Sequence, residues 1–238
     1  MAGDEKIIAA FDAAARSYDA WTQVQREVAH ALVARANGTP ATILDLGAGT
    51  GHVAGFARKQ WPGAKIAALD AAPNMLARLK AKYPEVETIR ADAETFATDA
   101  RYDLILSSMA LHWMSEPASV LRRWRRRLAP GGAMHVAIPV AGSLDEWRVF
   151  LRGAGLDDSL WPFPAQDFAG DIAASDIVEF PARFDNALAF ARSLKQSGAR
   201  RAAPGSRPLP APALRKTLAA RPGPFTATFR VAFLRIGG

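Results

Sequence analysis

The chain has 238 residues, half of them apolar, with twelve Phe and six Trp, which suffices for a hydrophobic core and excludes global disorder. Thirty Lys and Arg against 23 Asp and Glu give a net charge of +7, which indicates an anionic partner or substrate unless it only reflects an arginine-rich proteome. The chain lacks cysteine, and its four His do not have metal-ligand spacing, so we expect neither disulfides nor a bound metal.

The N-terminal residues, MAGDEKIIAAF, place acids before the first apolar residues, which is not the pattern of a signal peptide. No run approaches the ~20 apolar residues of a membrane span. We therefore expect a cytoplasmic protein that does not contact a membrane, and the chain length favours one domain.

Residues 5–35 have the apolar spacing of helices, with Tyr18 and Trp21 between two helical stretches, and the stretch 37–40 (NGTP) ends them. Short apolar strands then alternate with helices. The strands are expected at 41–47, 65–70, 86–91, 102–108 and 133–140, and the helices at 52–60, 73–83 and 117–128. This alternation predicts a parallel sheet with helices on both faces.

The pattern changes after Pro139. Residues 143–175 read as helices interrupted by 161–164 (WPFP), and 202–212 as a Pro-rich loop. Strands are expected at 176–184 and 225–236, and helices at 186–198 and 213–220. After Asp185 the chain holds ten Lys and Arg and no acid, so its last part is strongly basic.

The stretch ILDLGAGTGH, residues 43–52, is a strand that leads into a glycine-rich turn and then a helix. Gly47, Gly49 and Gly51 let the backbone approach a ligand closely, and amides at the helix N-terminus favour a polar or acidic group. The spacing is G-x-G-x-G, which differs from the G-x-G-x-x-G of dinucleotide-binding loops. An ordinary tight turn is the alternative.

Carboxylates follow the next two strands. Asp70 ends the second strand, about twenty residues after the loop, where a carboxylate can accept both ribose hydroxyls. Asp92 follows the third strand and is placed to reach an adenine edge. Because acids after strands also cap helices, only the ordered set that begins with Asp45 and the three glycines predicts this kind of ligand.

The segments LDLGAGTG, ALDAAPNML, ADAE and LILSSMALHW resemble the successive motifs of class I S-adenosylmethionine-dependent methyltransferases, over residues 10–140. The family commonly has Cys where Ala48 stands, but the backbone makes that contact. The resemblance implies S-adenosylmethionine as cofactor, held by Asp45, Gly47, Ala48, Gly49, Gly51, Asp70, Ala71, Asp92, Ala93 and Ser107.

The same resemblance implies an α/β fold with a Rossmann-like seven-stranded sheet, mostly parallel with an antiparallel last strand, and helices on both faces. The expected single domain, 1–238, would comprise an N-terminal helical cap (1–38), a cofactor-binding core (39–140), and a substrate lid with the last two strands (141–238).

A closer resemblance lies outside the cofactor motifs. The segments AFDAAARSYDAWTQVQRE, GSLDEW and RSLKQSGA resemble the malonyl-acyl-carrier-protein O-methyltransferases of biotin synthesis. This implies methylation of the free carboxylate of a malonyl thioester, on acyl carrier protein or coenzyme A, in the pimelate branch of that pathway.

Three other functions stay open. Methyltransferases of the trans-aconitate type share the ALHW stretch, so the acceptor could be another small acid, and a quinone precursor is a further possibility. The third is an RNA-binding protein with this fold. Because no aromatic residue lies between Phe190 and Phe225, the basic segment lacks the stacking platforms of single-strand binders, and we expect no nucleic-acid partner.

Methyl transfer to a carboxylate requires no general base, because the nucleophile is ionised near neutral pH. A basic side chain, best an Arg, is expected to orient it. We predict a site with Tyr18, His112 and Lys195 as catalytic residues. The substrate would be bound by Trp113, Arg192, Lys195, Arg200 and Arg201, and the basic segment would steer an acidic carrier. Packing roles for Tyr18, His112 and Trp113, and a solvated helix face for Lys195, are the alternatives.

Overall fold

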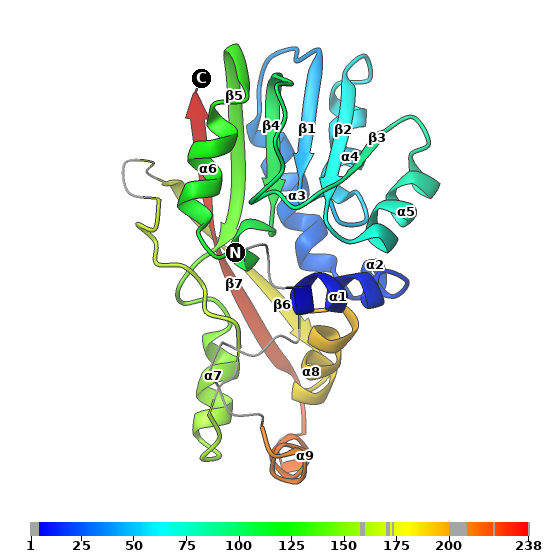
Figure 1. Ribbon diagram of the computed structural model, residues 1–238. Coiled ribbons are helices and arrows are strands. Elements are labelled where there is room, and N and C mark those ends of the chain that lie inside the picture. Colours follow the sequence, from blue (N-terminus) through cyan, green and yellow to red (C-terminus); the bar gives the residue numbers. More distant parts are fainter. Residues whose placement is uncertain are drawn as a thin grey trace.

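A seven-stranded sheet forms the centre of the computed structural model, which describes residues 5–157, 160–169, 172, 174–199, 209–220 and 222–237 (Figure 1). The strands are β1 (Thr42–Leu46), β2 (Lys65–Asp70), β3 (Glu87–Arg90), β4 (Tyr102–Ser108), β5 (Leu128–Pro139), β6 (Ala174–Phe184) and β7 (Phe225–Gly237). Their order is β3-β2-β1-β4-β5-β7-β6, and among the described strands β7 alone runs opposite to the others, antiparallel to both β5 and β6. The predicted mostly parallel sheet with an antiparallel last strand is therefore confirmed.

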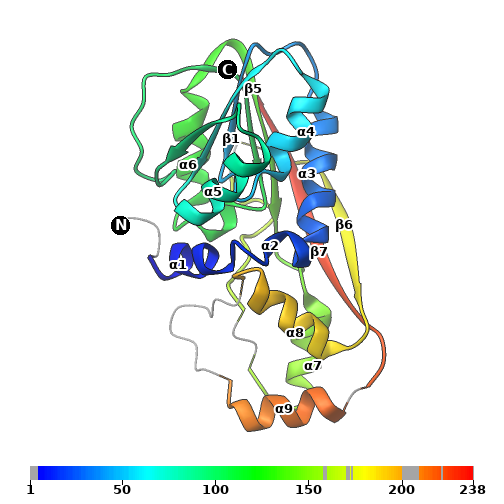
Figure 2. The ribbon, with the colours of Figure 1, turned by 90° about the vertical axis from the view of Figure 1, so that its right-hand side faces the viewer.

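The helices cover both faces of the sheet. They are α1 (Glu5–Ala14), α2 (Tyr18–Trp21), α3 (Gln23–Arg35), α4 (His52–Gln60), α5 (Pro73–Lys82), α6 (Pro117–Arg125), α7 (Asp145–Arg152), α8 (Ala187–Gln196) and α9 (Ala211–Ala220), with a 3-10 turn at Leu111–Trp113. Successive strand residues point to opposite faces, so Leu104 and Leu106 pack in the layer of α3 and α4 while Ile105 packs in the layer of α6 (Figure 2).

The chain order across the sheet places a crevice at one end. From β1 the sheet grows outward through β2 and β3, and β4 then adds to the other side of β1. The loops that leave the carboxyl ends of β1 and β4 therefore diverge, and ligands of open α/β sheets bind at such a point. Helices α1, α2 and α8 lie beyond this end of the sheet (Figure 1).

A second, smaller core lies at the far end of the β6–β7 hairpin, where α7, α8 and α9 gather (Figure 2). The ring of Trp147 is buried between Phe150, Phe190 and Phe225, with ring centroids 5.5, 5.1 and 6.0 Å away. Glu146 of α7 accepts hydrogen bonds from the backbone and hydroxyl of Thr228, which fixes α7 on β7. This core fixes the position of α8, which borders the candidate site described below.

Two segments differ from the sequence-based expectation. The stretch 130–132 (PGG) lies within β5 rather than in a loop, because β5 already pairs with Tyr102 at Leu128 and the register shifts before Leu104. A side chain at Gly132 would meet three backbone oxygens at 2.9–3.0 Å. Beyond α7, residues 153–157 and 160–169 form no helix; their fold depends on long-range bonds such as Trp161 Nε1 to the His112 carbonyl, 2.8 Å. No helix within the described ranges is both long and apolar enough to span a membrane.

Substitution of Trp147 should show how much the second core contributes to stability. We expect Trp147→Ala to lower the free energy of unfolding by about 3–5 kcal/mol, because a large buried ring leaves a cavity. Trp21→Ala is the matched control: this ring is 39% exposed, and its loss should cost less than about 1 kcal/mol. Urea denaturation of both variants measures the difference, and similar midpoints would contradict the packing described here.

Candidate active site

The glycine-rich loop after β1 forms the floor of a cleft at the carboxyl end of the sheet. Gly47 and Gly49 adopt φ values of +74° and +54°, which favour glycine. A Cβ at Gly47 would lie 2.4 Å from the Cβ of Ala110, so the loop after β4 leaves no room for a side chain there. The amides of Gly47 and Ala48 donate to the carbonyl of Leu69, at 2.8 and 3.0 Å, which fixes the loop against β2.

Asp70 connects this loop to the turn after β2. One carboxylate oxygen accepts from the amide of Gly49 and the other from the amide of Ala72, both at 2.8 Å. Burial raises the pKa of the Asp70 carboxyl, against the lowering effect of these backbone hydrogen bonds. Asp70 lines the cleft, and its carboxylate has more acceptor sites than these amides fill, which leaves capacity for a ligand.

Seven of the ten predicted cofactor residues line this one cleft: Gly47, Ala48, Gly49, Asp70, Ala71, Asp92 and Ala93. The other three lie beneath it. Buried Asp45 accepts from the amide of Ala54 at 3.1 Å, and the Ser107 hydroxyl donates to the Leu46 carbonyl at 2.7 Å. Gly51, with φ of +90°, precedes α4 and packs on Leu79. Their positions fit support of the loop rather than contact with a ligand.

Two buried polar atoms in the same cleft have no hydrogen-bond partner within the described structure, the hydroxyl of Ser108 and Oε2 of Glu94. The other carboxylate oxygen of Glu94 accepts from the amide of Ser115 at 3.0 Å, so the side chain is held in place. Because buried polar groups are rarely left unpaired, this arrangement fits a ligand with several hydrogen-bonding groups. The segments ADAE and SSM contain both residues, but their side-chain directions are not visible in the sequence.

Helices α1 and α2 form a cap over the cleft. Asp12 accepts from the backbone and side chain of Asn74, at 2.7 and 2.8 Å, which ties α1 to α5. Asp19 on α2 forms an ion pair with Lys82, 2.6 Å. The hydroxyl of Ser17 donates to the carbonyl of Gln196 at the end of α8, 2.9 Å, so the cap also contacts α8.

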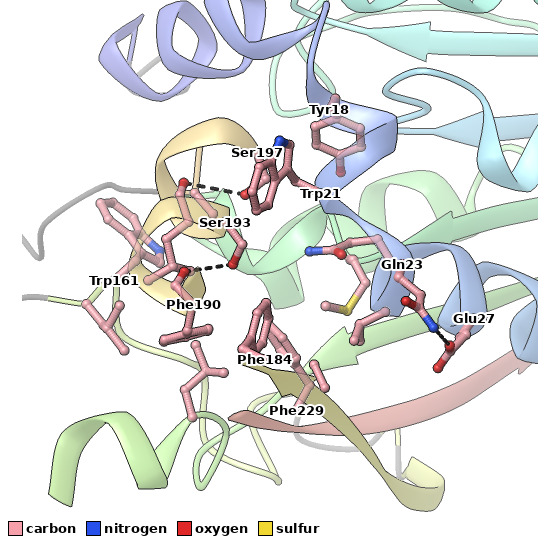
Figure 3. A pocket seen from close by; sticks show the side chains of 18 of the residues that line it. Tyr18, Trp21, Gln23, Glu27, Trp161, Phe184, Phe190, Ser193, Ser197 and Phe229 are labelled. Carbon is pink, nitrogen blue, oxygen red and sulfur yellow. Dashed lines mark hydrogen bonds between the residues drawn. The ribbon is translucent and has the colours of Figure 1, made fainter. Parts of the chain in front are cut away.

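A larger cavity of about 430 Å³ adjoins the cleft, within the ~300–1,000 Å³ range of small-molecule sites (Figure 3). Its wall is rich in aromatic side chains, which are Phe11, Tyr18, Trp21, Trp113, Trp161, Phe163, Phe184, Phe190 and Phe229. Figure 3 shows Tyr18 and Trp21 on one side and Phe184 and Phe229 on the opposite side. We call this the acceptor cavity, because it lies beside the cofactor cleft.

The structure brings together only some of the predicted substrate residues. Tyr18, His112 and Trp113 line the acceptor cavity. Arg192 and Lys195 are exposed on α8 and line neither cavity, since α8 presents the face of Phe190, Ser193 and Leu194. A role of Arg192 or Lys195 at the reacting carboxylate would require α8 to move, and stays a prediction. Arg200 and Arg201 lie outside the described residues.

Arg183 of β6 is the cation that lines the acceptor cavity among the described residues. Sequence reasoning missed it, because an Arg on a strand with alternating exposure reads as a solvent-facing residue. Arg123 of α6 has a structural role, because it donates to the carbonyls of Glu94, Thr95 and Phe96. In the described ranges, no three His, Asp or Glu side chains are grouped as metal ligands.

Neither Tyr18 nor His112 is an effective base near neutral pH. Burial, with the nearby charges of Asp70 and Asp19, raises the pKa of the Tyr18 hydroxyl, which therefore stays protonated. Burial lowers the pKa of His112 to about 3, so its ring is neutral. Nδ1 of His112 is buried and has no partner among the described groups.

A family model described as a methyltransferase domain matches residues 43–132. The malonyl-[acyl-carrier protein] O-methyltransferase of Neorickettsia risticii is 31% identical over 244 residues, which cover 97% of this chain and 95% of that protein. The chain belongs to the class I S-adenosylmethionine-dependent methyltransferases. S-adenosylmethionine is its expected cofactor, and the polar groups of the cleft fit such a ligand.

Other relatives agree on the family and differ in acceptor. The malonyl-[acyl-carrier protein] O-methyltransferase of Pseudescherichia vulneris is 32% identical over 200 residues, covering 81% of this methyltransferase and 79% of the relative. The trans-aconitate 2-methyltransferase of Azoarcus sp. is 30% identical over 146 residues, or 56% of each chain. The crystal structure of the YcgJ protein from Bacillus subtilis shares the fold, with a TM-score of 0.61 at 16% identity, covering 87% of this chain and 97% of YcgJ.

Two neighbouring serines offer a matched test of the cleft. Ser108→Ala should weaken binding of S-adenosylhomocysteine about 3- to 10-fold, because a neutral hydrogen bond to the ligand is lost. Ser107→Ala should leave that affinity unchanged and lower the free energy of unfolding by about 1 kcal/mol, because the Leu46 carbonyl loses its donor. Calorimetric titration and urea denaturation measure the two effects. If Ser107→Ala instead weakened binding and Ser108→Ala did not, Ser108 would not contact the ligand.

Asp45 should make the unliganded methyltransferase less stable as pH rises. Burial, with a smaller contribution from Asp70, raises the pKa of its carboxyl to about 7, whereas an unfolded Asp titrates near 3.9. The contribution of this group to stability is full below about pH 4 and is lost as pH rises towards about 7. Asn at this position keeps an acceptor for Ala54 and cannot ionise. The melting temperature of wild type relative to Asp45→Asn should therefore fall between pH 5 and pH 8.

Asp103→Asn is the control for this experiment. Hydrogen bonds from Thr42 lower the pKa of Asp103, so its contribution is lost only as pH falls below its ordinary pKa. The difference between wild type and Asp103→Asn should be constant from pH 5 to pH 8. A constant difference for Asp45→Asn as well would show that Asp45 is ionised in the fold.

Proposed function

We propose that this methyltransferase methylates the free carboxylate of a malonyl thioester, carried by acyl carrier protein or coenzyme A, in the pimelate branch of biotin synthesis. The observation that carries the proposal is that the acceptor cavity and the cofactor cleft share a wall in which no described residue is a basic catalyst. Phe11, Tyr18, Gln25, Met109 and Trp113 line both spaces. With Tyr18 protonated, none of the five can remove a proton from an acceptor near neutral pH.

The missing base selects the acceptor class. A carboxyl group loses its proton near pH 4 and reaches the site as an anion. A phenol such as a quinone precursor, or a protonated amine, would need a base to become nucleophilic at neutral pH. The ring of His112, whose pKa burial lowers to about 3, is too weak a base to fill this role. The site therefore suits an acid better than these acceptors.

S-adenosylmethionine, when bound, supplies a sulfonium methyl group: the new O–C bond forms as the C–S bond breaks, sulfur keeps that electron pair, and no proton moves. The residues of the chain align the acceptor and exclude water. Phe11, Met109 and Trp113 form an apolar wall at the junction of the two spaces. A dry junction strengthens the attraction between an anionic acceptor and a cationic donor.

The carrier is proposed from charge and similarity. Relatives named malonyl-[acyl-carrier protein] O-methyltransferase match most of the chain, and helices α8 and α9 expose Arg192, Lys195, Arg215 and Lys216. No acid follows Asp185 in the sequence. This surface would attract an acidic carrier protein over a distance and raise its association rate.

Trans-aconitate is the second candidate, favoured by the relative of that name. It is a tricarboxylate, and burying several charges requires several cations or donors. The acceptor cavity offers an aromatic wall and, among the described residues, one lining cation, Arg183. An acceptor with a single carboxylate and an uncharged arm fits this wall better.

Transfer of a labelled methyl group tests the acceptor. Malonyl-coenzyme A should be methylated, acetyl-coenzyme A should not, because it lacks the free carboxylate, and trans-aconitate should react at least about tenfold more slowly. Mass spectrometry of the product should show a methyl ester on the malonyl group. Preferential methylation of trans-aconitate, or of both thioesters, would contradict the proposal.

The same assay across ionic strength separates the two carriers. Malonyl-carrier protein should lose more of its kcat/KM than malonyl-coenzyme A as salt rises, since salt screens protein-sized charge attraction over a Debye length of about 8 Å at physiological strength. Equal salt dependence for both thioesters would argue against a docking role for the basic surface.

A further inference from the structure

Among the described residues, those that line both cavities offer hydrogen-bond donors and carry no charge. Of the five residues that line both spaces, three have a donor group: the hydroxyl of Tyr18, the amide of Gln25 and the indole of Trp113. The reacting carboxylate must lie here, because the methyl group passes from one space to the other. Its immediate surroundings are therefore polar at a few points and otherwise apolar.

Gln25 differs from its neighbour Gln23 in what its amide contacts. Gln23 also faces the acceptor cavity, but its amide nitrogen donates to Glu27 at 2.9 Å (Figure 3). Among the described residues, the amide of Gln25 and the hydroxyl of Tyr18 form no hydrogen bond at all. Both side chains are partly buried, so neither is fully solvated. Two such groups at the point of transfer are available to a ligand.

Cations lie elsewhere in the described structure. Of the residues for which the structure gives a position, those that line the cofactor cleft include no Lys or Arg. Lys82, close to the cap, is engaged by Asp19 at 2.6 Å and by the Thr50 carbonyl at 2.8 Å. Arg183 lines the acceptor cavity from β6 but not the cofactor cleft, so it does not reach the junction.

We propose that Gln25 and Tyr18 hold the acceptor carboxylate through uncharged hydrogen bonds, in place of the basic side chain that the chemistry first leads one to expect. The proposal rests on the function proposed above and names the residues that position its acceptor. The Gln25 amide and the Tyr18 hydroxyl donate to the carboxylate, and a lone pair on its attacking oxygen stays free. Because burial and nearby carboxylates raise the pKa of Tyr18, its hydroxyl remains a donor throughout the reaction.

Uncharged donors have a physical advantage because the acceptor carboxylate loses its negative charge during the reaction. The carboxylate loses its charge as the ester forms, so a guanidinium would stabilise the ground state more than the transition state and slow the transfer. Neutral donors fix the orientation of the carboxylate and depend less on that charge. Arg183, which lines the acceptor cavity but not the cofactor cleft, is left to contact the arm of the thioester.

Binding measurements without turnover test this arrangement. In the presence of S-adenosylhomocysteine, which carries no transferable methyl group, wild type should bind malonyl-coenzyme A more tightly than acetyl-coenzyme A. Gln25→Leu and Tyr18→Phe should each reduce this preference about tenfold or more, because a donor to a charged group is lost. Gln25→Glu, which keeps the size of the side chain, should reduce it further through like-charge repulsion. The affinity for acetyl-coenzyme A and the melting temperature show whether each variant is folded.

Arg183→Gln is the matched comparison. It should change the affinity for both thioesters alike and preserve their ratio. A ratio lost in Arg183→Gln, or preserved in both Gln25→Leu and Tyr18→Phe, would overturn the role of the uncharged donors while the malonyl acceptor stands. Equal affinity of wild type for both thioesters would overturn the malonyl acceptor itself, and this proposal with it.

Discussion

The carboxylate of Asp70 holds together the two turns on which the site depends. Through Gly49 it fixes the loop after β1, and through Ala72 it fixes the turn that begins α5. The loop then leaves so little space at Gly47 that the chain after β4 packs directly against it at Ala110. That contact places Met109, whose φ of +55° is uncommon for a residue with a side chain, between the cofactor cleft and the acceptor cavity. A change at the Asp70 carboxylate would therefore alter the loops after β1, β2 and β4 together.

The sequence was most informative where residue type and spacing are set by backbone geometry. The order of strands and helices, the glycine loop and Asp70 follow from apolar periodicity and from spacing along the chain, which a parallel sheet converts into proximity at one end. Asp45 and Ser107 belong to the cofactor motifs of β1 and β4, but their side chains bond beneath the loop, because adjacent strand residues face opposite sides of the sheet. A motif identifies the region, and side-chain direction decides which members meet a ligand.

The acceptor side was much less predictable. Arg192 and Lys195 belong to a basic helix, but which face of α8 turns inward depends on the second core around Trp147, formed by residues distant in sequence. Gln25 lies in a helical pattern like many surface glutamines, and only the meeting of two cavities distinguishes it. The residues that surround an acceptor come from α2, α3, β6, β7 and α8 together, so no local sequence pattern identifies them.

The contact between the cap and α8 has a consequence for the catalytic cycle. Phe11 and Tyr18 line both spaces, and Ser17 bonds the end of α8. A displacement of α1 and α2 that is large enough to admit or release the cofactor also removes a wall of the acceptor cavity. Exchange of the spent cofactor and departure of the ester are then governed by one opening event, and neither product would need a separate exit.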